Sequence, residues 1–280
     1  MKIDWQTTRA GVRNSFARMQ EEATSLQEAV LKQRYMDGWC PICARSSRFK
    51  LPDGQLGEWI NLRESLLCEC GMNGRLRLIA AMLESERPTS RFLMFERVTP
   101  LFAHVQRLCP DVEGCEYFGE DAAPGEVRMH AGLQVRHETM LDLSFPDNSL
   151  AYVFHGDVLE HVPDPELALR ECLRVLRPGG TLLFTCPMTN MDNHVVRARM
   201  VNGQLQHLLP PAFHGNPMDS SGALVFTEPG LSLLDDLRSS GFSTAELGVA
   251  LDAGLGILRD GNPYPDYDMW PVIFRARKAG

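Results

Sequence analysis

The sequence has no surplus of positive charge. Its 280 residues contain 28 lysines and arginines against 36 aspartates and glutamates, which gives a formal net charge of −8. Proteins that bind nucleic acid hold the phosphates with a basic surface, so this balance argues against a nucleic-acid substrate, although a local basic patch stays compatible with it.

Long apolar runs are absent as well. The N-terminus has no apolar stretch of signal-peptide length, and no segment approaches the roughly 20 consecutive apolar residues of a membrane span. We therefore expect a cytoplasmic protein that makes no use of a membrane. The eight cysteines of such a protein are expected to be thiols or metal ligands and not disulfides. Internal repeats and low-complexity tracts are also missing, and a composition of 44% hydrophobic and 23% charged residues is that of an ordinary globular protein.

The most informative stretch runs from Asp142 to Pro187. A turn at residues 146–149 precedes a short apolar run at residues 151–154, which predicts a strand covered on both faces. Asp164-Pro165 is typical of a helix start, and leucines and a cysteine then recur at helical spacing up to Leu176. Pro178-Gly179-Gly180 predicts the end of this helix, and residues 181–186 predict another strand. Strand, helix and strand in this order form a βαβ unit and hence a parallel sheet.

The same stretch resembles the second half of the class I S-adenosylmethionine-dependent methyltransferase family. The matching pieces are Leu143 to Leu150, Val158 to His161 in a Val-Leu-Glu-His motif, and Arg174 to Gly180. The resemblance implies an α/β, Rossmann-like fold over residues 90–280, with a mostly parallel sheet and helices on both faces. It also implies S-adenosylmethionine as the cofactor.

Two smaller segments precede this domain. Residues 1–37 contain apolar positions at helical spacing, and we expect a helical segment that covers the domain, forms a homodimer contact or acts as a substrate lid. Residues 38–89 carry two close cysteine pairs, after which Gly74 to Glu86 predict a helix and residues 88–90 a linker. The pairs are Cys40, Cys43, Cys68 and Cys70.

This cysteine spacing predicts a four-cysteine zinc unit. Each close pair lets two thiolates reach one tetrahedral ion. Four thiolates leave no coordination position for water, so we expect a structural zinc and not a catalytic one. The alternative is four thiols without a metal. The unit is similar to the cysteine cluster ahead of the catalytic domain in some ribosomal RNA methyltransferases, but the acidic charge argues against RNA.

The remaining elements are predicted from short apolar runs. Strands are expected at residues 92–95, 112–118, 135–140 and 269–276, and helices at residues 100–108, with Thr99 as N-cap, and 231–240. Residues 188–226 are expected to be an irregular insertion.

The resemblance implies cofactor contacts at the ends of the strands. The family's first motif has an acid followed by Gly-x-Gly, whereas this chain has Glu96-Arg97-Val98-Thr99 and no glycine. Arg97 is then expected to pair with the cofactor's carboxylate. Glu116 is expected to accept hydrogen bonds from the ribose hydroxyls. Thr139, or Glu138 if the register slips by one, takes the position that contacts the adenine amino group.

Three histidines are candidates for a general base. His155, in the His155-Gly156-Asp157 sequence after the fourth strand, faces the place of the transferred methyl group, and Asp157 is expected to contact the cofactor. His161 belongs to the Leu-Glu-His motif, and His214 lies in a Pro-rich turn of the insertion. A structural role is the alternative for each of them.

The sequence thus predicts an enzyme that transfers a methyl group from S-adenosylmethionine to an oxygen or nitrogen of a small molecule or sugar. Because the first motif has no glycine, two alternatives stay open. One is a non-catalytic relative that acts as a partner or scaffold. The other is a relative that uses S-adenosylmethionine for different chemistry or binds another nucleotide.

Overall fold

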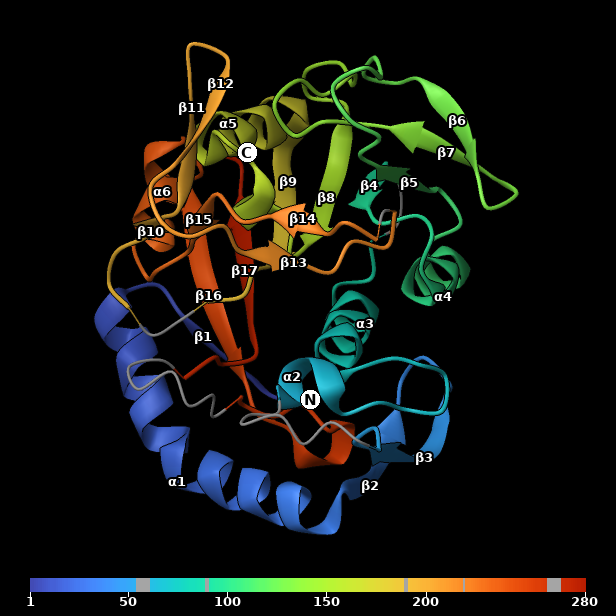
Figure 1. Cartoon of the computed structure of the whole chain (residues 1–280), viewed down its shortest axis with the longest axis vertical. Coiled ribbons are helices and arrows are strands. Elements are labelled where there is room, and N and C mark those ends of the chain that lie inside the picture. The colour runs from blue at the N-terminus through green and yellow to red at the C-terminus, as the bar shows by residue number, and fades with distance from the viewer. Residues whose placement is uncertain (54–60, 89–90, 189–190, 219, 261–267) are drawn as a thin grey trace. The chain divides into compact units, whose positions relative to one another are not determined.

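The computed structural model describes residues 1–53, 61–88, 91–188, 191–218, 220–260 and 268–280 (Figure 1). The chain divides into two compact units. Unit 1 comprises Met1–Arg87, Met188–Met191 and Glu246–Ile273, and unit 2 comprises Pro88–Pro187, Asp192–Ala245 and Phe274–Gly280. The linker expected at residues 88–90 coincides with the boundary between the units, although residues 89 and 90 lie outside the described residues.

Unit 1 is built around one long helix. Strand β1 (Ile3–Gln6) leads into α1 (Arg9–Gln33), whose N-terminus is capped by the Thr8 side chain, which accepts a hydrogen bond from the Gly11 amide. The prediction of helix over residues 1–37 holds for α1, but the flanking residues form strands. Strand β1 pairs antiparallel with β16 (Thr244–Ala250), and β2 (Tyr35–Cys40) pairs antiparallel with β3 (Arg45–Lys50). Helices α2 (Leu62–Ser65) and α3 (Gly74–Glu86) and the short η2 (Ala253–Leu255) complete the unit.

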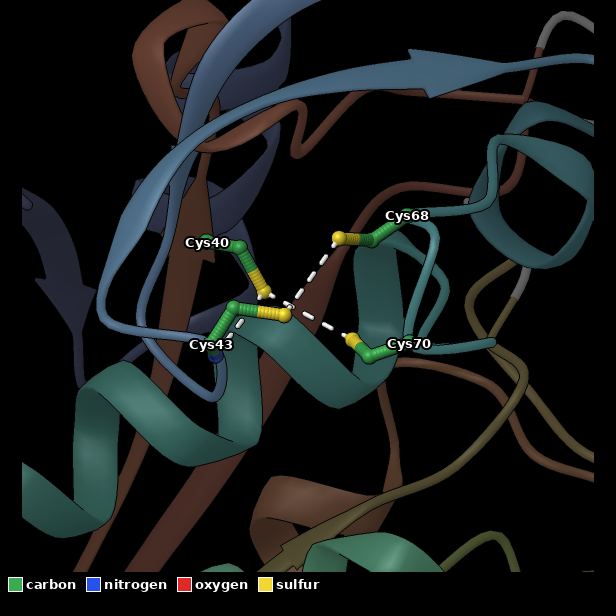
Figure 2. A group of neighbouring side chains, drawn as sticks. All are labelled: Cys40, Cys43, Cys68 and Cys70. Atoms are coloured by element: carbon green, nitrogen blue, oxygen red, sulfur yellow. Dashed lines mark hydrogen bonds between the residues drawn. The ribbon is translucent and has the colours of Figure 1, made fainter.

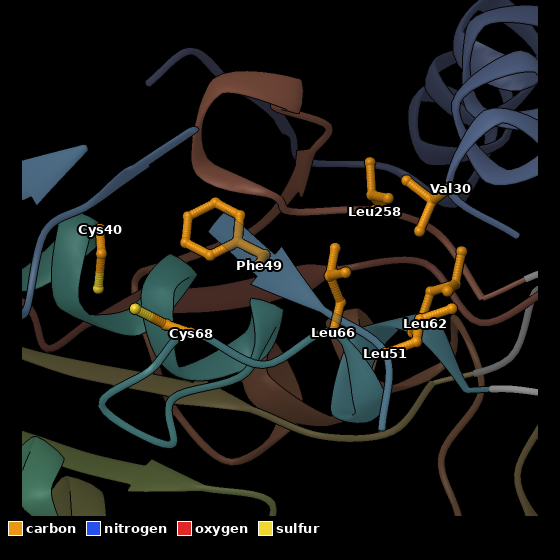
Figure 3. Close-up of a cluster of buried hydrophobic side chains, with 8 residues drawn as sticks. All are labelled: Val30, Cys40, Phe49, Leu51, Leu62, Leu66, Cys68 and Leu258. Atoms are coloured by element: carbon orange, nitrogen blue, oxygen red, sulfur yellow. The ribbon is translucent and has the colours of Figure 1, made fainter. Parts of the chain in front are cut away.

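One apolar cluster joins the helical and cysteine-bearing segments of unit 1. Its buried side chains come from α1, β2, β3, α2 and the chain that follows β3, α2 and η2 (Figure 3). They are Val30, Cys40, Phe49, Leu51, Leu62, Leu66, Cys68 and Leu258. The predicted division at residues 37 and 38 therefore does not separate two folding units, because both sides of it bury their side chains in the same core. Residues 246–273 also belong to this unit and not to the methyltransferase-like domain.

Helix α1 uses its apolar face inside unit 1. Phe16 stacks on Trp270 with ring centroids 4.9 Å apart, and Val12, Ala23 and Val30 are buried. The expected cover of the methyltransferase-like domain therefore stays a prediction, because these contacts lie within unit 1. The expected homodimer contact gains no support from these residues and stays a prediction.

Unit 2 contains a mostly parallel sheet. Its strand order is β17-β9-β8-β4-β5-β7-β6, and the pairs within β9-β8-β4-β5-β7 are parallel. The strands are β4 (Phe92–Phe95), β5 (Val112–Glu116), β6 (Val127–His130), β7 (Leu133–His137), β8 (Leu150–Gly156), β9 (Leu176–Thr185) and β17 (Val272–Arg277), which pairs with β9 through its last four residues. Helices α4 (Pro100–Leu108) and α5 (Pro165–Val175) connect parallel neighbours, and η1 (Leu159–His161) and α6 (Leu233–Ser239) complete the unit. The predicted Rossmann-like α/β fold is confirmed.

Two local predictions in the sheet were wrong. The strand expected at residues 135–140 is β7, which ends earlier and pairs antiparallel with the unpredicted β6. Ala131 and Gly132, both with positive φ, form the connecting turn, and alanine gives little sequence signal for this conformation. Helix α5 ends at Val175, and Pro178-Gly179-Gly180 lies within β9, next to the register shift in its pairing with β8. Gly180 is also close to Leu176 and to the Arg177 carbonyl, so a side chain there would clash.

The insertion at residues 188–226 is more regular than expected. Three short antiparallel pairs involve it: β10 (Val195–Val196) with β15 (Thr227–Glu228), β11 (Ala198–Val201) with β12 (Gln204–His207), and β13 (Phe213–His214) with β14 (Ala223–Leu224). Asn202-Gly203, both with positive φ, turns the β11–β12 hairpin, which stands out from the sheet of unit 2 in Figure 1. Residues 189, 190 and 219 of this segment lie outside the described residues. Among the helices of the described chain, none is long and apolar enough to cross a membrane.

Candidate functional site

The predicted cofactor contacts gather at the carboxyl ends of the parallel strands of unit 2. Glu96 follows β4, Glu116 ends β5, and the His155-Gly156-Asp157 sequence lies at the end of β8. The register places Phe95 beside His155, and Gly156 beside Thr185 of β9. In open α/β sheets this edge is where ligands bind, so the fold brings the candidates of the sequence to one edge.

Glu116 holds the glycine-free loop in place. Its Oε1 accepts hydrogen bonds from the backbone amides of Arg97, at 2.7 Å, and Val98, at 3.1 Å. Burial raises the pKa of the Glu116 carboxyl, and the two amide donors act in the opposite direction. No hydrogen bond to Oε2 occurs among the described residues, which leaves this oxygen for the predicted ribose contact. The sequence did not indicate that the carboxylate also organises the loop after β4.

Three side chains of the first motif, those of Glu96, Arg97 and Thr99, also have contacts within the protein. The Thr99 hydroxyl donates a hydrogen bond to the buried Glu96 carboxylate. The guanidinium of Arg97 lies over the Phe102 ring of α4, 4.7 Å from its centroid. Pairing of Arg97 with a cofactor carboxylate would therefore require its side chain to leave this ring, and it stays a prediction.

Glu138 is engaged in holding the chain after β7. The side chain is buried, Arg136 Nε donates to Oε1 at 2.6 Å, and the Ser144 amide donates to Oε2 at 3.0 Å. Thr139 is half-buried, and its hydroxyl accepts from the Leu141 amide at 3.3 Å. Since both Glu138 oxygens already have donors, Thr139 is the better placed of the two for the predicted adenine contact.

The structure argues against His155 as the general base. The side chain is fully buried and stacks on Phe184 with ring centroids 4.5 Å apart, and neither ring nitrogen has a hydrogen-bond partner among the described residues. Burial lowers the pKa of His155 to about 3. A base must reach its substrate, and this imidazole has no exposed surface. Asp157, with φ 53°, accepts a hydrogen bond from the Thr185 hydroxyl at 2.7 Å and is half-buried at the same strand end.

The buried His155 predicts a specific loss of stability in acid. Above about pH 6.5 the imidazole is neutral in both states, whereas below it only the unfolded chain takes up the proton. At about 1.36 kcal/mol per pH unit, the free energy of unfolding should fall by about 2 kcal/mol between pH 6.5 and pH 5 through this residue. In urea unfolding at pH 7 and pH 5, His155→Phe should show that much less pH dependence than the wild type. The exposed His207, changed to glutamine, should leave the pH dependence as it is; an identical profile for His155→Phe would mean that the imidazole is accessible to protons.

The other two histidine candidates lie together in unit 2. The rings of His161 and His214 meet edge to face, with centroids 5.0 Å apart. Both face the buried Glu160, whose Oε1 is 3.5 Å from His161 Nε2 and 3.5 Å from His214 Nδ1. Glu160 was missed by the sequence reasoning, which considered only the histidine of the Leu-Glu-His motif.

The four predicted zinc cysteines of unit 1 converge on one point, as Figure 2 shows. The Sγ atoms of Cys40 and Cys70 are 3.8 Å apart, those of Cys43 and Cys68 are 3.7 Å apart, and all four lie within 4.8 Å of one another. A tetrahedral ion with Zn–S bonds of about 2.3 Å separates its sulfurs by about 3.8 Å. The described cysteines are free thiols. The set therefore fits a tetrahedral zinc ion in both chemistry and spacing.

A buried arginine lies next to this cluster. Arg77 has no exposed surface and donates to the carbonyl oxygens of four residues, namely Leu66 (3.1 Å), Met72 (2.7 Å), Leu255 (2.6 Å) and Gly256 (2.9 Å). Its guanidinium also lies 3.8 Å from the centroid of the Phe49 ring. Burial lowers the pKa of Arg77 to about 10, while the neighbouring cysteines raise it. Four thiolates around Zn²⁺ carry a net charge of −2, which this cation would partly compensate.

Comparison with known proteins finds similarity to methyltransferases in the part of unit 2 that contains the strand ends. Residues 96–184 match the family model of the methyltransferase domain. The demethylmenaquinone methyltransferase of Listeria welshimeri is 36% identical over 85 residues, which are 30% of this chain and 35% of that protein. A probable S-adenosylmethionine-dependent methyltransferase of Mycolicibacterium smegmatis is 36% identical over 77 residues, 27% of this chain and 29% of that protein. The similarity thus spans about a third of these relatives.

Solved structures show a weaker likeness. A methyltransferase of Mesorhizobium loti aligns with 75% of this chain and 100% of its own, at 16% identity and a TM-score of 0.46. A methyltransferase of Listeria monocytogenes aligns with 74% of this chain and 99% of its own, at 9% identity and a TM-score of 0.46. Overlaps of this quality add nothing to the assignment. The match of residues 96–184 confirms the resemblance to class I S-adenosylmethionine-dependent methyltransferases that the sequence indicated.

Proposed function

We propose that this chain, whose residues 96–184 form a methyltransferase domain, transfers a methyl group from S-adenosylmethionine to an oxygen or nitrogen of a small molecule or sugar. The observation that carries the proposal is the coincidence of this domain with the carboxylates of Glu96 and Glu116 at the ends of the neighbouring parallel strands β4 and β5. Carboxylates at this edge suit a ligand with hydroxyl groups, because each can accept more than one hydrogen bond.

The residues divide the work between cofactor and acceptor. S-adenosylmethionine supplies an already activated methyl group, so the protein needs to position the reactants and remove one proton. Glu116 Oε2 holds the ribose, Thr139 contacts the adenine, and Glu96 and Asp157 line the same edge. His214, which is half-exposed, replaces the buried His155 as the base.

We propose a small acceptor because the protein is acidic. A net charge of −8 repels a polyanion such as RNA, although it leaves small molecules and sugars equally acceptable. The names of the Listeria relatives describe a methyltransferase for demethylmenaquinone, which is also a small molecule. We propose a cytoplasmic location because the eight cysteines form no disulfide bond.

We also propose that Cys40, Cys43, Cys68 and Cys70 hold a structural zinc ion. The support is the spacing of their sulfurs, 3.8 Å from Cys40 to Cys70 and 3.7 Å from Cys43 to Cys68, which equals the edge expected for a zinc tetrahedron. A full set of four thiolates leaves no position for a substrate, so this ion stabilises unit 1 and takes no part in catalysis.

One observation favours the alternative of a non-catalytic relative. Glu116 Oε1 already accepts two backbone amides of the loop, so part of the predicted ribose contact is occupied by the protein itself. In that case the chain would keep the fold and act as a partner or scaffold without binding the cofactor.

Replacement of Glu116 tests the proposed ribose contact. Glu116→Gln keeps the size of the side chain and removes its charge, so S-adenosylmethionine should bind about 10- to 150-fold more weakly in calorimetric titration, which corresponds to about 1.5–3 kcal/mol for a hydrogen bond to a charged group. Glu113→Gln, the same change at an exposed position of the same strand, should bind as the wild type does. Equal affinity of Glu116→Gln and wild type, with the fold intact by circular dichroism, would place the ribose elsewhere.

A further inference from the structure

Three side chains of unit 2 form a cluster that neither the cofactor site nor the cysteine cluster uses. Glu160 and His161 are neighbours on η1, and His214 lies on β13 in the insertion. One ligand atom from each side chain lies within 4.8 Å of those of the other two. We infer that Glu160, His161 and His214 bind one divalent metal ion of the zinc class.

The buried carboxylate of Glu160 gives the first support. Its side chain has no exposed surface, and neither Oε1 nor Oε2 has a hydrogen-bond donor among the described residues. An ionised carboxylate without partners is costly to bury, because it has lost its hydration. A cation bound between Glu160 and the two histidines would supply the missing partner.

The separation of the ligand atoms is the second support. Oε1 of Glu160 is 3.5 Å from His161 Nε2 and 3.5 Å from His214 Nδ1. These distances exceed the usual 2.7–3.2 Å of an N–H···O hydrogen bond. With metal–ligand bonds of about 2.0–2.2 Å, two ligands at adjacent corners of a tetrahedron lie about 3.3–3.6 Å apart. The spacing therefore fits ligands of one ion better than a direct hydrogen bond.

The backbone around the cluster fixes the orientation of the ligands. Nδ1 of His161 lies 2.8 Å from the carbonyl oxygen of Leu224, which can only accept, so Nδ1 carries the proton and Nε2 presents a lone pair toward Glu160. Such a second hydrogen bond is typical of histidines that bind metals. Leu224 also pairs with Phe213, next to His214, and the Phe226 amide donates to the Glu160 carbonyl at 2.8 Å. Strand β14, which contains Leu224, thus contacts His161 and pairs with the strand of His214.

Exposure increases from the carboxylate to the outer histidine. Glu160 is fully buried, His161 is 16% exposed and His214 is 42% exposed, so an ion can enter beside His214. The two imidazoles suit Zn²⁺ and its first-row neighbours better than Mg²⁺ or Ca²⁺, which prefer oxygen ligands alone, and a carboxylate also binds Zn²⁺. Three protein ligands leave at least one coordination position for an oxygen ligand, such as water or a hydroxyl group of a small molecule.

A metal ion at this site would lower the pKa of a hydroxyl group bound at its open position. The deprotonated oxygen would then be a better methyl acceptor. This role rests on the proposed function and would take the place of His214 as the base, because a metal-bound imidazole has no free lone pair to accept a proton. Metal binding itself does not depend on the proposed function. The test therefore measures the metal and not the activity.

Zinc content of the full chain tests the inference. Wild type loaded with excess Zn²⁺ and freed of unbound ions should contain one ion per chain more than Glu160→Gln or His214→Ala, as counted by mass spectrometry of the metal. His207→Ala, which removes an exposed histidine of the same insertion, should keep the wild-type content. His214 is 42% exposed, so its removal should leave the fold intact even if Glu160→Gln does not.

Cobalt distinguishes this site from the cysteines. Loaded with Co²⁺, the wild type should show d–d bands of a nitrogen- and oxygen-ligated ion that His214→Ala lacks, while any thiolate-to-cobalt charge-transfer bands persist in both. Equal metal content and equal spectra in wild type and His214→Ala would overturn the inference.

Discussion

Replacing Cys70 by alanine should abolish zinc binding at the cysteine cluster and lower the free energy of unfolding by on the order of 5 kcal/mol. The reason is that binding of structural zinc, worth about 10–16 kcal/mol in small zinc-binding peptides, is coupled to folding. Cys40 and Cys68 also belong to the buried apolar cluster of unit 1 (Figure 3), so loss of the ion would disturb the core that joins α1 to the cysteine segment. Urea unfolding and metal analysis on the same preparation measure both effects.

A thiol outside the cluster provides the control. Cys172 is fully buried in α5, and its change to alanine should cost only about 1 kcal/mol of packing and no zinc. If Cys70→Ala does not fold, removal of the ion from the wild type with a chelator should produce a comparable loss of stability. Wild type that is folded without metal and insensitive to the chelator would contradict the zinc assignment.

The second large effect is expected at Arg77. Arg77→Met keeps an unbranched side chain of similar length but removes the donors of four buried carbonyl groups, and it also removes the cation next to the cysteine cluster. We expect a loss of about 3–5 kcal/mol in the free energy of unfolding, the usual cost of leaving buried polar partners uncompensated.

An exposed arginine of the same unit serves for comparison. Arg45 is 61% exposed and pairs with Glu69, which is 62% exposed, so Arg45→Met should cost less than about 1 kcal/mol. If denaturant unfolding gives the same stability for Arg77→Met and Arg45→Met, the buried guanidinium does not hold the segments of unit 1 together.

Local sequence signals were sufficient to predict the helices and strands at the centre of unit 2. Helix α4 and strand β4 have the predicted bounds, as has α3 in unit 1. Asp164 caps α5 as predicted, since its side chain accepts from the Leu167 amide. These elements are short, apolar and bounded by residues whose conformational preferences are strong, so neighbours in the sequence decide their structure.

Long-range pairing explains what the sequence did not predict. Strand β1 forms only because it pairs with β16 from the other end of the chain, and Leu258 completes an apolar cluster begun by Val30. In the site, His161 and His214 meet because β14 contacts both, which no local pattern reveals. The burial of His155 is likewise a property of the surrounding strands, and the motif that contains it suggested a base.

The central claim is that this chain binds S-adenosylmethionine, and calorimetric titration of the wild type with S-adenosylmethionine tests it most directly. Because the loop from Glu96 to Thr99 has no glycine and bends around Glu116, we expect a modest dissociation constant, on the order of micromolar or weaker, near −8 kcal/mol. The cofactor should also raise the thermal unfolding temperature. If millimolar S-adenosylmethionine gives neither heat of binding nor thermal stabilisation, the chain is not a methyltransferase that uses this cofactor.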